Sequence, residues 1–275
     1  MKELLPYQIG ILGAGRMAGA IVDGLLKKGG MEPTAIACTC GADYTGAHLA
    51  AKTGIAYVES GVEMVRSSDT LILACKPQQF SDLSEEAGEA ARGLLLISIL
   101  AGTRIKTLRG RFGGCRAIVR TMPNTPAQVG AGVTGWSLET EAAALSDFDS
   151  ARLQLILGAL GKSIQLPEAL LDAVTALSGS GPAYLFELTA ALEEAGRVAG
   201  LDEDAARLLA RETVIGSARL LEEDPASPEE LRVRVTSPGG TTEAALGVLE
   251  QKGFRSMLTA AVLRARDRSK ELSEL

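Results

Sequence analysis

The feature that most constrains the fold is a series of short, uninterrupted apolar segments that alternate with helix-like segments through the first 166 residues. Strands of a parallel sheet covered on both faces are apolar throughout, and helices supply the crossovers that such a sheet requires. We therefore expect an α/β domain with a doubly wound, Rossmann-type sheet over residues 1–166. Its strands are predicted at residues 7–12, 34–40, 55–58, 69–75, 94–100, 115–122, 132–138 and 162–166.

The pattern changes after Leu166. Residues 167–275 contain no convincing strand, and successive segments carry the 3.6-residue periodicity of helices. Several of these helices are apolar over broad faces, which a helical domain of roughly 110 residues has little room to bury. We expect an all-helical domain over residues 167–275 that packs against a second copy of the chain, giving a homodimer. A self-contained bundle is the alternative.

Composition excludes several classes of protein. Apolar residues make up 46% of the 275 residues and charged residues 23%, which argues against disorder, and a net charge of −6 provides no basic face for nucleic acid. The single histidine, His48, and four cysteines with unsuitable spacing predict no metal site. We expect His48 to lie at the surface or, if the chain binds a nucleotide, on the adenine side of that ligand. The beginning of the chain lacks the features of a signal peptide, and the longest aliphatic run, at residues 94–100, is too short to span a membrane. A cytoplasmic protein is expected.

A glycine-rich motif follows the first predicted strand and begins the first helix. In the G-x-G-x-x-A sequence, Gly13 allows the tight turn, Gly15 lets the backbone approach a pyrophosphate, and Ala18 lets helix and strand pack. The strand before the motif and the helix after it are the context of a dinucleotide site. The residues predicted to contact the cofactor here are Gly13, Gly15, Arg16 and Met17.

The end of the second strand bears on which nicotinamide cofactor is bound. An NAD site places Asp or Glu there to bind the ribose 2′-hydroxyl, but the strand ends in Ala37-Cys38-Thr39-Cys40. This absence leaves room for a 2′-phosphate, to which Thr39 could donate a hydrogen bond, although no arginine follows. The sequence favours NADPH and leaves use of NADH open.

Later strands end in residues suited to the same site. Ligands bind beyond the carboxyl ends of parallel strands, and three segments in that position carry small residues, a lysine and an amide. The residues predicted to face the cofactor are Ala74, Lys76, Pro77, Ala101, Gly102, Pro123 and Asn124.

Five segments together make the chain similar to the pyrroline-5-carboxylate reductases, which make proline. They are IGILGAGRMAGAI, LILACKPQQF, VRTMPNTPAQVGAGVTG, DAVTALSGSGPAY and VTSPGGTTEAAL, in that family's order and spacing. The resemblance implies a Rossmann domain and a helical domain interlocked in a dimer; in some members, dimers assemble into larger rings. At the second-strand turn, where many members carry Ser-Asn-Arg and others Ser-Ser-Pro, this chain has Cys38-Thr39-Cys40, so Thr39 inherits the phosphate-contacting position.

The resemblance also implies a substrate, a five-membered cyclic imine with a carboxylate. Gly239 to Thr242 lie at the predicted start of a helix, where unpaired backbone N–H groups favour an anion. Hydroxyl groups of Ser237 and Thr241 can add hydrogen bonds, and by the family pattern Thr242 approaches the ring nitrogen as the catalytic residue. The expected substrate-binding residues are Ser237, Gly239, Gly240, Thr241, Thr242 and Ser180.

The segment Ser178 to Pro182 has two interpretations: a substrate-side loop, or a close contact between helices that requires small residues, with Ser180 capping the next helix. Two other functions also stay open. A β-hydroxyacid dehydrogenase shares the two-domain organisation but would place a lysine in the segment LSGSGPAYLFELTAAL, which has none. A nucleotide-sensing regulatory protein would not require SPGGTT.

Overall fold

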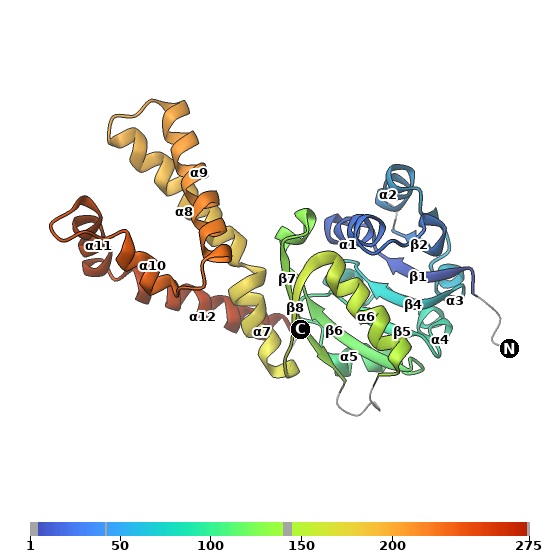
Figure 1. Ribbon diagram of the computed structural model, residues 1–275. Coiled ribbons are helices and arrows are strands. Elements are labelled where there is room, and N and C mark those ends of the chain that lie inside the picture. Colours follow the sequence, from blue (N-terminus) through green and yellow to red (C-terminus); the bar gives the residue numbers. More distant parts are fainter. Residues whose placement is uncertain (1–4, 42, 140–144, 274–275) are drawn as a thin grey trace. The chain divides into compact units, whose positions relative to one another are not determined.

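The computed structural model describes residues 5–41, 43–139 and 145–273. Eight strands form one sheet in the order β3-β2-β1-β4-β5-β6-β7-β8 (Figure 1). Every strand expected from the sequence is present, although β3 is reduced to two residues. The strands are β1 (Tyr7–Leu12), β2 (Ile36–Thr39), β3 (Ala56–Tyr57), β4 (Ser68–Leu73), β5 (Leu95–Ser98), β6 (Ala117–Met122), β7 (Gly132–Leu138) and β8 (Gly161–Gln165).

One strand departs from the expected parallel arrangement. β7 runs antiparallel to β6, with Val119 opposite Leu138 and Met122 opposite Gly135. The cause is the connection, which is the short 3-10 turn Thr125–Val129 and not a helix long enough for a crossover. The helix α6 (Asp147–Leu160) then returns the chain to the sheet, and β8 pairs parallel to β7.

Helices cover both faces of the sheet, which explains the uniformly apolar strands (Figure 1). Successive residues of β4 point to opposite sides: Ile72 belongs to the core beneath α1 (Arg16–Lys27), α2 (Thr45–Thr53) and α6. Leu71 and Leu73 belong to a second core. That second core is closed by α3 (Gly61–Arg66), α4 (Glu85–Ala90) and α5 (Ile105–Arg111).

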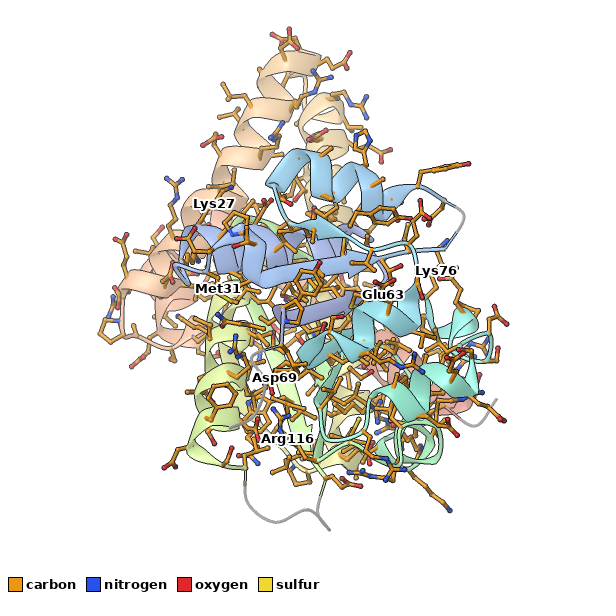
Figure 2. All side chains as sticks on the ribbon, turned by 90° about the vertical axis from the view of Figure 1, so that its right-hand side faces the viewer. Lys27, Met31, Glu63, Asp69, Lys76 and Arg116 are labelled. Atoms are coloured by element: carbon orange, nitrogen blue, oxygen red, sulfur yellow. The ribbon has the colours of Figure 1, made fainter. Side chains whose placement is uncertain are left out.

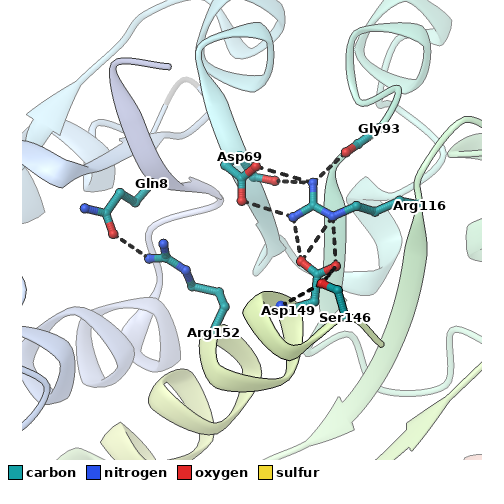
Figure 3. A network of polar contacts seen from close by, with 7 residues as sticks. All are labelled: Gln8, Asp69, Gly93, Arg116, Ser146, Asp149 and Arg152. Carbon is teal, nitrogen blue, oxygen red and sulfur yellow. Dashed lines mark hydrogen bonds and ion pairs between the residues drawn. The ribbon is translucent and has the colours of Figure 1, made fainter. Parts of the chain in front are cut away.

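A polar network joins the amino ends of the strands to α6 (Figure 3). Arg116, just before β6, donates to Asp69 at the start of β4 at 3.0 Å and to Asp149 on α6 at 2.7 Å. On the next turn of α6, Arg152 donates to the Gln8 amide at 2.8 Å. The two carboxylates compensate the charge of the partly buried Arg116 guanidinium, and the Gln8 amide oxygen accepts from Arg152. This network holds the sheet and α6 together.

The chain divides into two compact units. Unit 1 comprises residues 1–180 and 265–275, and unit 2 comprises residues 181–264. Strands give way to helices at the end of β8, as expected near residue 166, but unit 1 continues through α7 (Leu171–Val174), which packs against β6 and β7. It also includes the end of α12 (Phe254–Ser273), where Ser269 meets Asp172.

Unit 2 is entirely helical in the described residues. Its helices are α8 (Gly181–Val198), α9 (Glu203–Glu223), α10 (Pro228–Arg234), α11 (Thr241–Gln251) and the first part of α12. Helices α8 and α9 pack closely, since a Cβ on Gly196 would lie 3.2 Å from Ala206. Within residues 181–264, Ala206 and Ala210 are the only apolar residues that are buried. Large side chains are left exposed, among them Leu185, Phe186, Leu208, Leu221 and Met257.

Candidate functional site

A cleft opens at the topological switch point of the sheet, where the strand order reverses. From β1 the chain builds β2 and β3 on one side and β4 onward on the other, so the loops after β1 and β4 diverge. A cavity of about 460 Å³ lies there, lined by the carboxyl ends of β1, β2 and β4 and the residues after β3. This is the position in which open α/β sheets bind ligands.

Gly13 and Gly15 have different reasons for being glycine. Gly13 has φ +103°, and a Cβ there would meet the backbone nitrogen of Cys75 at 2.4 Å, so the fold itself requires glycine. Gly15 has φ −73° and ψ −174°, which any residue adopts, and a Cβ on it would meet nothing within 4 Å. The open space above Gly15 is where a ligand can reach the backbone.

The start of α1 offers unpaired backbone donors to such a ligand. Gly15 is its N-cap residue, no side chain caps it, and its first turn carries no acidic residue. The N–H groups of a first turn and the helix dipole stabilise a phosphate placed against them. These residues fit the pyrophosphate of a dinucleotide.

The cleft contains a neutral thiol and one cation. Burial raises the pKa of the Cys75 thiol to about 11, so at neutral pH Cys75 is protonated and does not act as a nucleophile. Lys76 is the one basic side chain among the described residues that line the cleft. It lies beyond the carboxyl end of β4, whereas Asp69 lies at the other end of that strand (Figure 2).

The cleft gathers part of the predicted cofactor set. Gly13, Gly15, Thr39, Ala74 and Lys76 line it, and Thr39, which is buried, donates through Oγ1 to the Glu59 carbonyl oxygen at 3.4 Å. His48 is exposed on α2 and does not line it. The other predicted cofactor residues lie outside the lining and stay predictions: Arg16, Met17, Pro77, Ala101, Gly102, Pro123 and Asn124.

Two of those residues have contacts that the sequence did not predict. The Asn124 side-chain oxygen accepts a hydrogen bond from the Val133 backbone N–H at 2.9 Å, which holds the turn between β6 and β7. Gly102 lies against the end of α12, where a Cβ would be 3.5 Å from the backbone of Leu272. Each position therefore has a structural explanation of its own.

In the Ser178–Pro182 segment, Ser180 is a bend between a π-helix and α8, which begins at Gly181. Residues Thr175–Gly179 form a π-helix, a geometry often found at functional sites. Ser180 is the C-cap residue of the π-helix, and its φ of −83° and ψ of −20° are not the extended backbone of an N-cap. Gly179 makes a close contact with a strand, not the contact between helices that was expected, because a Cβ there would lie 2.7 Å from the Met122 Cε at the end of β6.

The late glycine turn begins α11 as expected. Gly239 has φ +70°, which favours glycine, and the Gly240 N–H donates to the Ser237 carbonyl oxygen at 3.0 Å. Gly240 is the N-cap residue, and no side chain caps the helix. The backbone N–H groups that follow, including those of Thr241 and Thr242, are therefore uncapped donors of the kind with which helix N-termini bind anions.

Sequence reasoning missed Glu243. Its carboxylate accepts a hydrogen bond from the Gly239 N–H at 2.7 Å, which places a negative charge beside the anion site. Glu243 has the three-residue spacing from the N-cap that a capping box uses, although the N-cap is Gly240 and the carboxylate accepts from the N–H one residue earlier; the spacing could have drawn attention to it.

Two further candidate classes find no support in the described residues. No group of three or more His, Cys, Asp or Glu side chains there could hold a metal ion. No helix in that part of the chain is long and apolar enough to cross a membrane.

Two family models match the chain, one in each half. Residues 8–102 match the model described as NADP oxidoreductase, coenzyme F420-dependent. Residues 168–272 match the model described as pyrroline-5-carboxylate reductase dimerisation. The first match includes the cleft and the second includes the glycine turn.

Relatives match over nearly the full length. A pyrroline-5-carboxylate reductase of Arabidopsis thaliana is 36% identical over 99% of both chains. A solved structure of the reductase from Coxiella burnetii is 35% identical, with a TM-score of 0.87 over 98% of this chain and 99% of that one. A Plasmodium falciparum pyrroline carboxylate reductase with NADP bound is 26% identical, with a TM-score of 0.83 over 98% of this chain and 100% of the other.

Proposed function

The chain belongs to the pyrroline-5-carboxylate reductase family, and from this premise we propose how its parts divide one reaction. The protein is an oxidoreductase that reduces the C=N bond of 1-pyrroline-5-carboxylate to L-proline with NAD(P)H, the last step of proline biosynthesis. The observation that carries this conclusion is the match over 99% of both chains, which includes the cleft and the glycine turn.

The cleft of unit 1 holds the dinucleotide. The amides at the start of α1 bind its pyrophosphate, and the absence of a side chain at Gly15 lets the phosphates approach. Bound NAD(P)H supplies the hydride. Arg16, Met17, Pro77, Ala101, Gly102, Pro123 and Asn124 remain candidates for contacts with the rest of the cofactor.

The glycine turn of unit 2 binds the substrate carboxylate. Backbone N–H groups at Thr241 and Thr242 point out of the uncapped end of α11, where the helix dipole favours a negative charge. Hydroxyl groups of Ser237 and Thr241 add donors, Gly239 and Gly240 keep the approach open, and Ser180 is a further substrate-side residue.

The Thr242 hydroxyl orients the imine nitrogen. The reaction adds a hydride to the imine carbon and a proton to nitrogen, so the C=N double bond becomes a C–N single bond and one C–H and one N–H bond form. A protonated imine is already electrophilic, and positioning of the reacting carbons therefore dominates over acid–base catalysis. Six-membered cyclic imines that carry a carboxylate have the same two functional groups, the C=N bond and the carboxylate, and are the next substrates to examine.

The chain assembles as a homodimer through its helical domain. Unit 2 leaves Leu185, Phe186, Leu208, Leu221 and Met257 exposed, which a second copy would cover. The relatives' dimerisation model spans residues 168–272, the part of the chain that includes this unit. Rings of dimers are the form of higher assembly to look for, and the cytoplasm is the proposed compartment.

A spectrophotometric assay tests the proposed function. Purified protein mixed with 1-pyrroline-5-carboxylate and NADH or NADPH is expected to consume the reduced nicotinamide and form proline. Cofactor binding without turnover would support the regulatory alternative, and oxidation of a β-hydroxy acid would support the dehydrogenase alternative.

A further inference from the structure

We propose that this chain selects NADH over NADPH and that the Asp43 carboxylate makes the selection. The proposal rests on the proposed function only in that the cleft holds a nicotinamide dinucleotide. It reverses the order that the sequence favoured, because Asp43 lies beyond the strand end at which an acidic residue is usually sought.

On the side of β2 and β3 the described lining of the cleft carries only negative charge, whereas the β4 side carries Lys76 together with Asp82. Asp43 follows β2 and Glu59 follows β3, and both line the cleft. Lys76 follows β4, which flanks β1 on the side opposite β2. Because a Rossmann domain binds the adenosine ribose at the end of its second strand, the 2′ position meets the two carboxylates and lies across β1 from the lysine.

The structure fixes Asp43 and keeps it charged. Its Oδ1 accepts hydrogen bonds from the Thr45 hydroxyl at 2.8 Å and from the Thr45 backbone N–H at 3.3 Å, at the start of α2. These bonds hold the pKa of the Asp43 carboxyl below its usual range. Cys40 makes a further side-chain hydrogen bond to this carboxylate. Because a carboxylate has about four acceptor positions, Asp43 can still accept a hydrogen bond from a ribose 2′-hydroxyl.

A 2′-phosphate would meet this carboxylate without compensation. A phosphate monoester brings a charge of about −1.5 to −2 at neutral pH. No arginine and no second lysine are among the described residues of the lining. Thr39, the expected phosphate donor, already directs its hydroxyl to the Glu59 carbonyl. The nucleotide side of the cleft therefore repels a 2′-phosphate and accepts a hydroxyl.

Calorimetric titration of the full-length protein tests the proposal without any turnover. Wild type is expected to bind NADH about tenfold more tightly than NADPH, and 5′-AMP more tightly than 2′,5′-ADP. Raising the salt concentration from about 0.05 to about 0.5 M should narrow both ratios, because repulsion between exposed charges is screened.

Two isosteric variants isolate the residue. D43N keeps an acceptor for Thr45 and removes the charge, and it should reduce the NADPH-to-NADH ratio of Kd values at least about threefold. Asp82 also lines the cleft but follows β4, so D82N serves as the matched control and should leave the ratio unchanged.

Equal or tighter binding of NADPH by wild type would overturn the proposal, as would equal ratios in D43N and D82N. Should D43N fold poorly, the wild-type ratio of the Kd values for NADPH and NADH, and its dependence on salt, still test the proposal. A reductase that prefers NADPH refutes this selection and leaves the proposed function intact. A protein that binds NADH more tightly than NADPH but does not reduce 1-pyrroline-5-carboxylate would refute the proposed function and leave the cofactor selection intact.

Discussion

Ser269, near the end of α12, donates a hydrogen bond of 2.7 Å to the Asp172 carboxylate on α7, 97 residues earlier in the chain. Both side chains are buried. Asp172 also lies 3.9 Å from the Arg120 guanidinium on β6. The end of α12 is therefore joined to the sheet of unit 1 by a buried polar contact.

The S269A variant is expected to destabilise the protein by about 1.5–3 kcal/mol, because it removes a hydrogen bond to a buried carboxylate. Chemical denaturation at neutral pH measures this change. S256A is the control: Ser256 is exposed on the same helix and bonds only locally, to the Gly253 carbonyl. Equal midpoints for both variants would contradict the structural role of Ser269.

Substitutions at the two glycines of the motif should separate folding from binding. G13A is expected to cost more than about 3 kcal/mol, because it combines a positive φ with a backbone clash. G15V should leave the melting temperature nearly unchanged and abolish NADH binding, because its side chain fills the space of the pyrophosphate. A calorimetric titration of G15V with wild-type affinity would refute the assignment of that space.

The sequence predicted the architecture well because its patterns are local. Unbroken apolar runs indicate the strands, and the glycine motif identifies β1 and α1. The direction of β7 depends on the length of one turn, Thr125–Val129, and the periodicity of the strands alone does not reveal it.

T242A is expected to lower kcat/KM about tenfold without altering stability, because it removes the hydroxyl that we propose orients the imine nitrogen. T242S, which retains the hydroxyl, should keep most of the activity. Steady-state kinetics measure the activity of both variants, and a thermal melt measures their stability. Activity lost equally in both variants would point to packing of the methyl group and not to the hydroxyl.

Neutralising Glu243 should strengthen substrate binding. In E243Q the side-chain oxygen can still accept from the Gly239 N–H, while the charge beside the anion site disappears. We expect KM for 1-pyrroline-5-carboxylate to fall about two- to fivefold at low salt. E250Q, at the other end of α11, is the control. A KM that rises in E243Q alone would show that the carboxylate assists binding.

The details of the candidate site were less accessible from the sequence. Asn124 and Gly102 lie at strand ends that suit a cofactor, but the contacts with Val133 and Leu272 come from segments distant in sequence. The helical backbone of Ser180 depends on the π-helix before it, which periodicity does not distinguish from an ordinary helix. Glu243, by contrast, follows a known capping spacing and could have been found.

Transfer of deuterium tests the central claim most directly. NADH labelled with deuterium at the transferable C4 position is mixed with the protein and 1-pyrroline-5-carboxylate, and the product is analysed by mass spectrometry and NMR. The account predicts proline one mass unit heavier, with the label on C5, the former imine carbon. Absence of proline, or proline without deuterium at C5, would contradict it.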